Sequence, residues 1–95
     1  MALYMIAVVN IQDAESYRAY EQGAIPTLEG YGVEVLAYGV PRGIEGKVPA
    51  QRAALLKFKD QETFDRWYAS PAYQAVKQIR IEHAESPFII TLEGL

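Results

Sequence analysis

A short pattern of residues occurs twice in this chain, and its second copy begins about half a chain length after the first. Residues 13–20 read Asp, x, Glu, hydroxyl, aromatic, x, x, aromatic, and residues 60–67 repeat that order. Each copy follows a short apolar run, at 3–11 and at 53–58. An apolar run followed by a capping aspartate is typical of a strand that leads into a helix. The repeat therefore predicts a fold built from two βαβ-like halves.

The remaining turn and capping signals give the element order β-α-β-β-α-β. Strands are expected at residues 3–9, 33–38, 52–59 and 88–92, and a loop containing three glycines and two prolines at 39–49. Right-handed crossovers would place both helical segments on the same face of the sheet. We therefore predict an α+β, ferredoxin-like βαββαβ sandwich with a four-stranded antiparallel sheet, formed by a single domain over residues 1–95.

Capping residues also predict where the helices begin and end. Asp13 and Asp60 each begin a helix, and a glycine at position 30 or 32 ends the first one. Ser70-Pro71 splits the second helical segment, since serine is a favoured cap and proline suits the first helical position. Ser86-Pro87 is expected to end the helix that follows. The positions expected to face inward on that helix are Ala72, Ala75 or Val76, Ile79 and His83.

The overall composition narrows the classes of function. The net charge of −3 and the scattered lysines and arginines argue against a nucleic-acid partner, which usually requires a basic stripe. The chain has no cysteine, so a disulfide framework and a thiolate site are excluded. The apolar start has no basic leader and is too short to span a membrane. We expect a cytoplasmic protein that does not contact membranes.

The strands carry apolar residues on both faces, whereas a sheet with one wet face alternates apolar and polar residues. The first strand has Tyr4, Ile6 and Val8 on one side and an equally apolar row on the other. Helices cover one face, and the second face needs another cover. The simplest cover is the same face of a second copy, stacked about 10 Å away. The sequence therefore predicts a homodimer.

Several strings of residues resemble the bacterial domain-of-unknown-function family thirteen-thirty, which belongs to the dimeric α+β barrel superfamily. The strings are the acidic–aromatic start at 13–20, Glu45-Gly46, Trp67-Tyr68-x-Ser70-Pro71-x-Tyr73-Gln74, Arg80 and Glu93-Gly94. The resemblance covers nearly the whole chain and implies a ferredoxin-like protomer that pairs face to face as a dimeric barrel. It implies little about activity, since the superfamily includes cofactor-free monooxygenases, isomerases, cyclases and haem enzymes.

A set of aromatic residues is the first candidate for a ligand-binding site. These residues are Tyr17, Tyr20, Trp67, Tyr68 and Tyr73. They can line a pocket between helices and sheet, with phenol hydroxyls aimed at a small aromatic or carbonyl-bearing ligand. They can also simply fill the core of a small domain. The helix break at Ser70-Pro71 favours a cleft beside Tyr68 and Tyr73.

Three polar residues are candidates for catalysis. Arg80 can hold a carboxylate or an enolate oxygen, or it can pair with a carboxylate such as Glu45. Glu45 can act as a general base, or it can belong to loop structure next to Gly46. His83 can move a proton, or it can sit at a helix C-terminus because a histidine there meets the negative end of the dipole.

Two classes of function follow from these candidates. The first is a cofactor-independent enzyme, monooxygenase- or isomerase-like, that acts on a small aromatic or carbonyl metabolite. The second is a non-catalytic dimeric module that binds a small ligand or has a structural role. One histidine, no cysteine and scattered acids predict no metal site, and the glycine spacing matches no phosphate-binding loop. No cofactor is expected.

Overall fold

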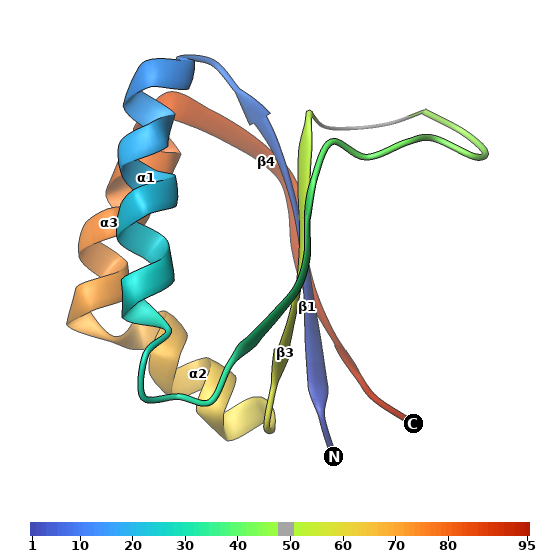
Figure 1. Ribbon diagram of the computed structural model, residues 1–95, viewed down its shortest axis with the longest axis vertical. Helices are drawn as coiled ribbons and strands as arrows, with labels where there is room; N and C mark the ends of the chain where they lie inside the picture. Colours follow the sequence, from blue (N-terminus) through green and yellow to red (C-terminus); the bar gives the residue numbers. More distant parts are fainter. Residues whose placement is uncertain (48–50) are drawn as a thin grey trace.

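In the computed structural model, which describes residues 1–47 and 51–95, three helices cover one face of a four-stranded sheet (Figure 1). The elements are β1 Leu3–Ile11, α1 Ala14–Thr27, β2 Glu34–Gly39, β3 Arg52–Phe58, α2 Gln61–Ala69, α3 Pro71–His83 and β4 Ala84–Glu93. The strand order is β2-β3-β1-β4 and all neighbouring strands are antiparallel. This is the predicted ferredoxin-like βαββαβ fold. None of the helices described here is both long and apolar enough to cross a bilayer.

The repeated pattern in the sequence is a helix cap in both copies. A carboxylate oxygen of Asp13 accepts a hydrogen bond from the backbone N–H of Ser16 at 3.3 Å, and the Ser16 hydroxyl donates to the other oxygen at 2.9 Å. One carboxylate oxygen of Asp60 accepts from both the backbone N–H and the hydroxyl of Thr63, at 2.8 and 2.6 Å. Each aspartate thus satisfies free N–H groups in the first turn of its helix.

The predicted split of the second helical segment is confirmed. Ser70 ends α2 and begins α3, where its hydroxyl oxygen accepts from the backbone N–H of Tyr73 at 3.2 Å. The same hydroxyl donates to the carbonyl of Trp67 at 2.7 Å, so one side chain serves both helix ends. Pro71 occupies the first turn of α3, where its missing N–H costs no helical hydrogen bond.

The inward face of α3 differs from the prediction. Tyr73 and Arg80 are its buried residues, whereas Ala72 and Ala75 are exposed to solvent. Of the predicted inner positions, Val76 packs against the core, whereas Tyr73 was absent from the predicted positions. The helix instead turns its largest ring inward, and the long side chain of Arg80 follows one face with it.

Two element boundaries also differ from the prediction. Helix α1 ends at Thr27, and the glycines at 30 and 32 lie beyond it with φ of 90° and 68°. They form the turn before β2, which only a glycine adopts without strain. Helix α3 ends at His83, so Ser86 and Pro87 lie within β4 and do not break the helix. Proline is tolerated there because β4 is an edge strand of the sheet.

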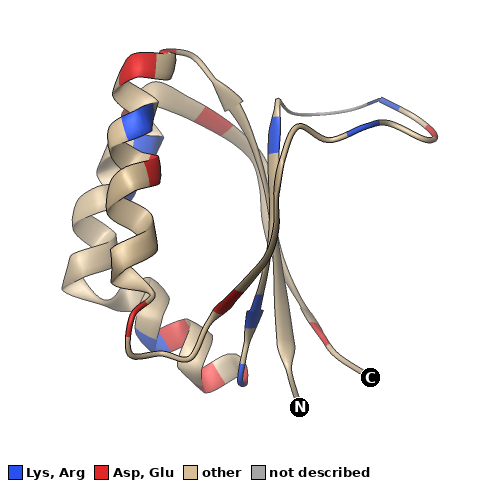
Figure 2. Cartoon of the chain, viewed as in Figure 1, with Lys and Arg blue, Asp and Glu red and all other residues tan. Residues whose placement is uncertain are grey.

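The two faces of the sheet have different surroundings. The helix-covered face contains the core, where Leu3 and Phe58 are at most 1% exposed. The opposite face bears no element of the described chain (Figure 1). Its central row is Leu55, Ile6 and Ile90, which are cross-strand neighbours. Charged residues lie on the helices, in the 40–47 loop and toward strand ends, so the middle of the sheet is uncharged (Figure 2).

Candidate functional site

A cavity of about 210 Å³ lies between the helices and the helix-covered face of the sheet. Side chains from β1 and β3 form its floor, among them Met5 and Leu56. Ala7 and Ala54 also line it and lie directly opposite each other across the two strands. Ala24 lines it from α1. The cavity exists because small side chains meet where larger ones would fill the layer between helices and sheet.

All five aromatic residues of the predicted set line this cavity, namely Tyr17, Tyr20, Trp67, Tyr68 and Tyr73. The rings of Trp67 and Tyr73 are 4.2 Å apart between centroids, and the hydroxyls of Tyr20 and Tyr73 are hydrogen-bonded at 2.8 Å. The indole N–H of Trp67 donates to the hydroxyl of Thr27 at 3.0 Å. Trp67 and Tyr73 are nearly fully buried. The rings therefore belong to the core and form the cavity wall at the same time.

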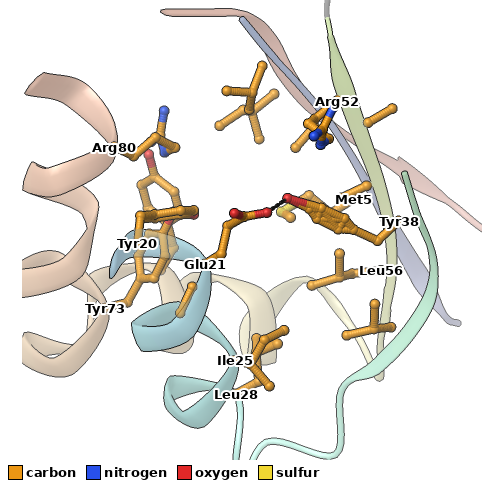
Figure 3. A pocket seen from close by; sticks show the side chains of 18 of the residues that line it. Met5, Tyr20, Glu21, Ile25, Leu28, Tyr38, Arg52, Leu56, Tyr73 and Arg80 are labelled. Carbon is orange, nitrogen blue, oxygen red and sulfur yellow. Dashed lines mark hydrogen bonds between the residues drawn. The ribbon is translucent and has the colours of Figure 1, made fainter. Parts of the chain in front are cut away.

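The mouth of the cavity lies between α1 and β2. Ile25, Val35 and Tyr38 line the cavity and yet are 57%, 45% and 45% exposed, so they form its rim. The phenol hydroxyl of Tyr38 donates to a carboxylate oxygen of Glu21 and joins the two elements across this rim (Figure 3). Arg52 on β3 also lines the cavity. The mouth therefore carries polar groups, whereas the floor is apolar.

Burial keeps the hydroxyls of Tyr17, Tyr20 and Tyr38 protonated. Burial, and next the nearby carboxylate of Glu21, raises the pKa of Tyr17 to about 12. Burial also raises the pKa of Tyr20, with Tyr73 adding to the effect. The pKa of Tyr38 is raised by burial and by its hydrogen bond to Glu21. These phenols are therefore hydrogen-bond donors at neutral pH, not bases.

Arg80 places a positive charge at the helix side of the cavity. It lies beside Tyr20 and Tyr73 (Figure 3), and its guanidinium carbon is 5.9 Å from the centroid of the Tyr20 ring. One terminal nitrogen, Nη1, donates to the hydroxyl of Ser86 on β4 at 2.9 Å. Burial lowers the pKa of Arg80, but the neighbouring phenol oxygens raise it by more, so the net shift is upward. The side chain remains charged.

Glu45 lies outside the cavity. It is an exposed residue of the 40–47 loop, which projects from the sheet on the side away from the helices (Figure 1). The expected pairing with Arg80 is therefore wrong, because the sheet separates the two residues. The end of the predicted loop, residues 48 and 49, lies outside the described residues.

His83 also lies outside the cavity, at the C-terminal end of α3. Its backbone carbonyl accepts from the N–H groups of Gln12 and Asp13 at 3.0 and 3.3 Å. Its imidazole lies 3.9 Å from the carboxylate of Glu82. Within residues 1–47 and 51–95, no three His, Cys, Asp or Glu side chains gather in a way that could hold a metal ion. The structure thus places His83 where helix and strand join.

Three polar residues of the cavity are missing from the predicted set: Glu21, Tyr38 and Arg52. Glu21 follows Tyr17 by four residues, so helical spacing could have placed it on the same face. Simple alternation along β2 puts Val35 and Tyr38 on opposite faces. A bulge between Val35 and Ala37 shifts the register and brings both to the cavity. No sequence signal marks that bulge.

Several solved structures share this fold at low sequence identity. RPA0582, a protein of unknown function from Rhodopseudomonas palustris, matches with a TM-score of 0.81 and 20% identity over 99% of this chain and 82% of that one. A dimeric ferredoxin-like protein of unknown function from Jannaschia sp. CCS1 matches with a TM-score of 0.73 and 19% identity, over 99% and 100%. A mutant of SnoaB, a cofactor-independent oxygenase from Streptomyces nogalater, matches with a TM-score of 0.71 and 14% identity. That match covers 98% of this chain and 92% of that one.

These structural likenesses establish the fold. No curated protein matches the chain. The family model described as Domain of unknown function (DUF1330) matches residues 2–95. Because that match spans nearly the whole sequence, this protein belongs to the DUF1330 family.

Proposed function

We propose that this protein binds a small aromatic or carbonyl-bearing metabolite in its cavity and acts on it without a cofactor. The observation that carries the proposal is an apolar cavity with several hydrogen-bond donors in its wall. Its volume, about 210 Å³, exceeds the ~150 Å³ of an apolar cavity that takes up benzene. It is smaller than the roughly 300–1,000 Å³ of pockets for drug-sized ligands. A single ring with one or two small substituents suits this size.

The polar groups of the cavity favour negative charge on an oxygen atom of the ligand. The phenols of Tyr20 and Tyr73 and the guanidinium of Arg80 can polarise a carbonyl group. Glu21 lines the same cavity and can accept a proton from the carbon next to that carbonyl, while the electron pair moves onto the oxygen as an enolate. We assign this proton transfer to Glu21, since Glu45 and His83 lie elsewhere.

An enolate held in this way suits an isomerase-like reaction, in which a proton returns to a different carbon. With dioxygen as the oxidant, the same enolate is also the electron-rich species that a monooxygenase-like reaction requires. The fold likeness to SnoaB, a cofactor-independent oxygenase, is consistent with the second reaction but is an analogy between folds.

Trp67 offers a direct test of ligand binding, because it is the only tryptophan and lines the cavity. We expect a neutral single-ring probe such as benzamide to change its fluorescence in a saturable way. Ala54→Phe places a ring in the cavity floor and should abolish that change. The matched control Ala72→Phe, at an exposed site on α3, should leave it intact. Binding that survives Ala54→Phe, or no response to single-ring probes, would overturn the proposal.

A non-catalytic binding module is the second candidate, and two observations favour it. The carboxylate of Glu21 is already hydrogen-bonded to Tyr38, and the shifted phenol pKa values lie far above neutrality. Mass spectrometry of a metabolite extract incubated with the protein separates the two candidates. An enzyme converts a compound that Glu21→Gln only retains, whereas a binding module retains it unchanged in both forms.

The bare face of the sheet supports a homodimer as the functional assembly. Phe88, Ile90 and Leu92 lie on this face and are 40%, 46% and 61% exposed in the protomer. A contiguous apolar surface of this kind is typical of an interface. The Jannaschia protein with the same fold is described as dimeric. In this assembly the two sheets face each other and the cavities lie on the outer sides.

A further inference from the structure

Arg80 is a buried cation whose hydrogen-bonding groups are incompletely used. Its side chain is 7% exposed. Nη1 donates to Ser86, but the buried Nε–H has no hydrogen-bond partner among the residues that the structure describes. Buried polar groups normally have a partner, and leaving a buried donor unsatisfied is unfavourable, more so on a charged group. The unused donor sits on a residue that lines the cavity.

The described chain also provides no anion for this cation. The ion pair found in residues 1–47 and 51–95 joins His83 to Glu82, and Arg80 is not part of it. The phenol of Tyr20 is neutral, because burial raises its pKa above the ordinary value. The carboxylate of Glu21 is bonded to Tyr38 at the mouth (Figure 3). A buried charge is normally paired, so the missing partner points to a ligand.

A second copy of the chain is not a suitable source of the anion. The face left bare for a partner lies on the opposite side of the sheet from α3 (Figure 1). Residues that cover that face are separated from Arg80 by the full thickness of the sheet. The cavity that Arg80 lines offers a route by which an anion can reach the guanidinium.

We propose that the ligand of this cavity is a small monocarboxylic acid whose carboxylate binds Arg80, with its apolar body between Trp67 and the floor of β1 and β3. The inference rests on the proposed binding function and specifies its ligand class. A guanidinium offers a planar fork of donors that matches a carboxylate. The apolar floor and the volume of about 210 Å³ leave room for one ring beyond the carboxylate.

Benzoate and benzamide test this assignment, because they have nearly the same shape and differ in charge. Trp67 fluorescence follows the titration of each probe near neutral pH and at low salt. We expect benzoate to bind the wild-type protein at least about tenfold more tightly than benzamide. Arg80→Gln should abolish this preference and retain benzamide binding, whereas Arg80→Lys should keep part of the preference. Arg66→Gln is the matched control, since Arg66 is exposed on α2 and does not line the cavity, and it should leave the preference in place.

The outcomes separate this inference from the proposed function. Equal binding of the two probes overturns the monocarboxylate assignment and leaves the binding function standing, whereas binding of neither overturns both. A preference retained in Arg80→Gln also overturns the assignment. If Arg80→Gln does not fold, a crystal structure of the wild-type protein with benzoate decides. A carboxylate within hydrogen-bond distance of Arg80 supports the inference, and a carboxylate elsewhere refutes it.

Discussion

Trp67 shows how one side chain serves stability and binding together. Its ring lies 5.4 Å from Phe58 and 4.2 Å from Tyr73 between centroids, and its indole N–H is bonded to Thr27. The same ring lines the cavity. A substitution at this position therefore changes both the stability of the fold and ligand binding. Comparing a small replacement with a large one separates these two effects.

We expect Trp67→Ala to lower the free energy of unfolding by about 3–5 kcal/mol, because it removes a fully buried ring. Trp67→Phe keeps most of the apolar contact and loses the hydrogen bond to Thr27, so about 1–2 kcal/mol is expected. Urea denaturation followed by circular dichroism, with every variant at the same protein concentration, measures the loss of unfolding free energy for both variants. A loss below about 1 kcal/mol for Trp67→Ala would show that the ring serves the cavity and not the core.

At the scale of single residues, the sequence identifies the aromatic wall but not the mouth. Large rings at helical spacing must face the sheet, so Tyr17 and Trp67 can be predicted from spacing alone. Tyr38 cannot be, because a bulge in β2 decides which face it joins. Arg80 was a candidate, but the absence of a carboxylate partner for it in the described chain follows from tertiary structure.

At the scale of elements, capping residues predict helix starts better than helix ends. Asp13, Asp60 and Ser70 begin helices where expected, because each side chain binds N–H groups close to it in sequence. Pro87 was expected to follow a helix and instead lies in β4. Pro87 is tolerated in β4 because β4 is an edge strand, and the strand order cannot be predicted from neighbouring residues in the sequence.

The cap at Asp60 predicts a dependence of stability on pH. Hydrogen bonds from the side chain and then the backbone of Thr63 lower the pKa of Asp60 below its ordinary value of 3.8. A lowered pKa stabilises the fold above the unfolded-state value, and this stabilisation is lost as the pH falls through the folded-state value. We therefore expect Asp60→Ala to lower the melting temperature near neutral pH. The gap to wild type should narrow below about pH 4.

Thermal unfolding followed by circular dichroism over a pH series measures this gap. Asp60→Asn is the matched control, because it keeps an acceptor oxygen and cannot titrate there. Its melting temperature should lie between those of the wild type and Asp60→Ala near neutral pH. If the difference in melting temperature between wild type and Asp60→Ala stays constant into strong acid, the ionised carboxylate of Asp60 does not stabilise the helix.

At the scale of the whole molecule, the sheet divides two roles between its faces. The helix-covered face holds the core and the cavity, whereas the bare face offers an uncharged surface around Leu55, Ile6 and Ile90. A stable dimer buries roughly 1,600 Å² or more in total. Stacking two sheets through these faces would give each protomer the apolar burial that a chain of 95 residues lacks.

Ile90→Lys tests this assembly, because Ile90 flanks the central strand of the bare face. A lysine there would bury an unpaired charge in each half of the interface. We therefore expect dimerisation to weaken by about 3 kcal/mol or more, which raises the dissociation constant of the dimer more than about a hundredfold. Ile81→Lys is the matched control, since Ile81 is 51% exposed on α3, on the far side of the sheet. Sedimentation velocity at micromolar concentrations should give a dimer for the wild type and Ile81→Lys, and a monomer for Ile90→Lys. A folded wild-type monomer, or a dimer unaffected by Ile90→Lys, would show that something other than a second sheet covers this face.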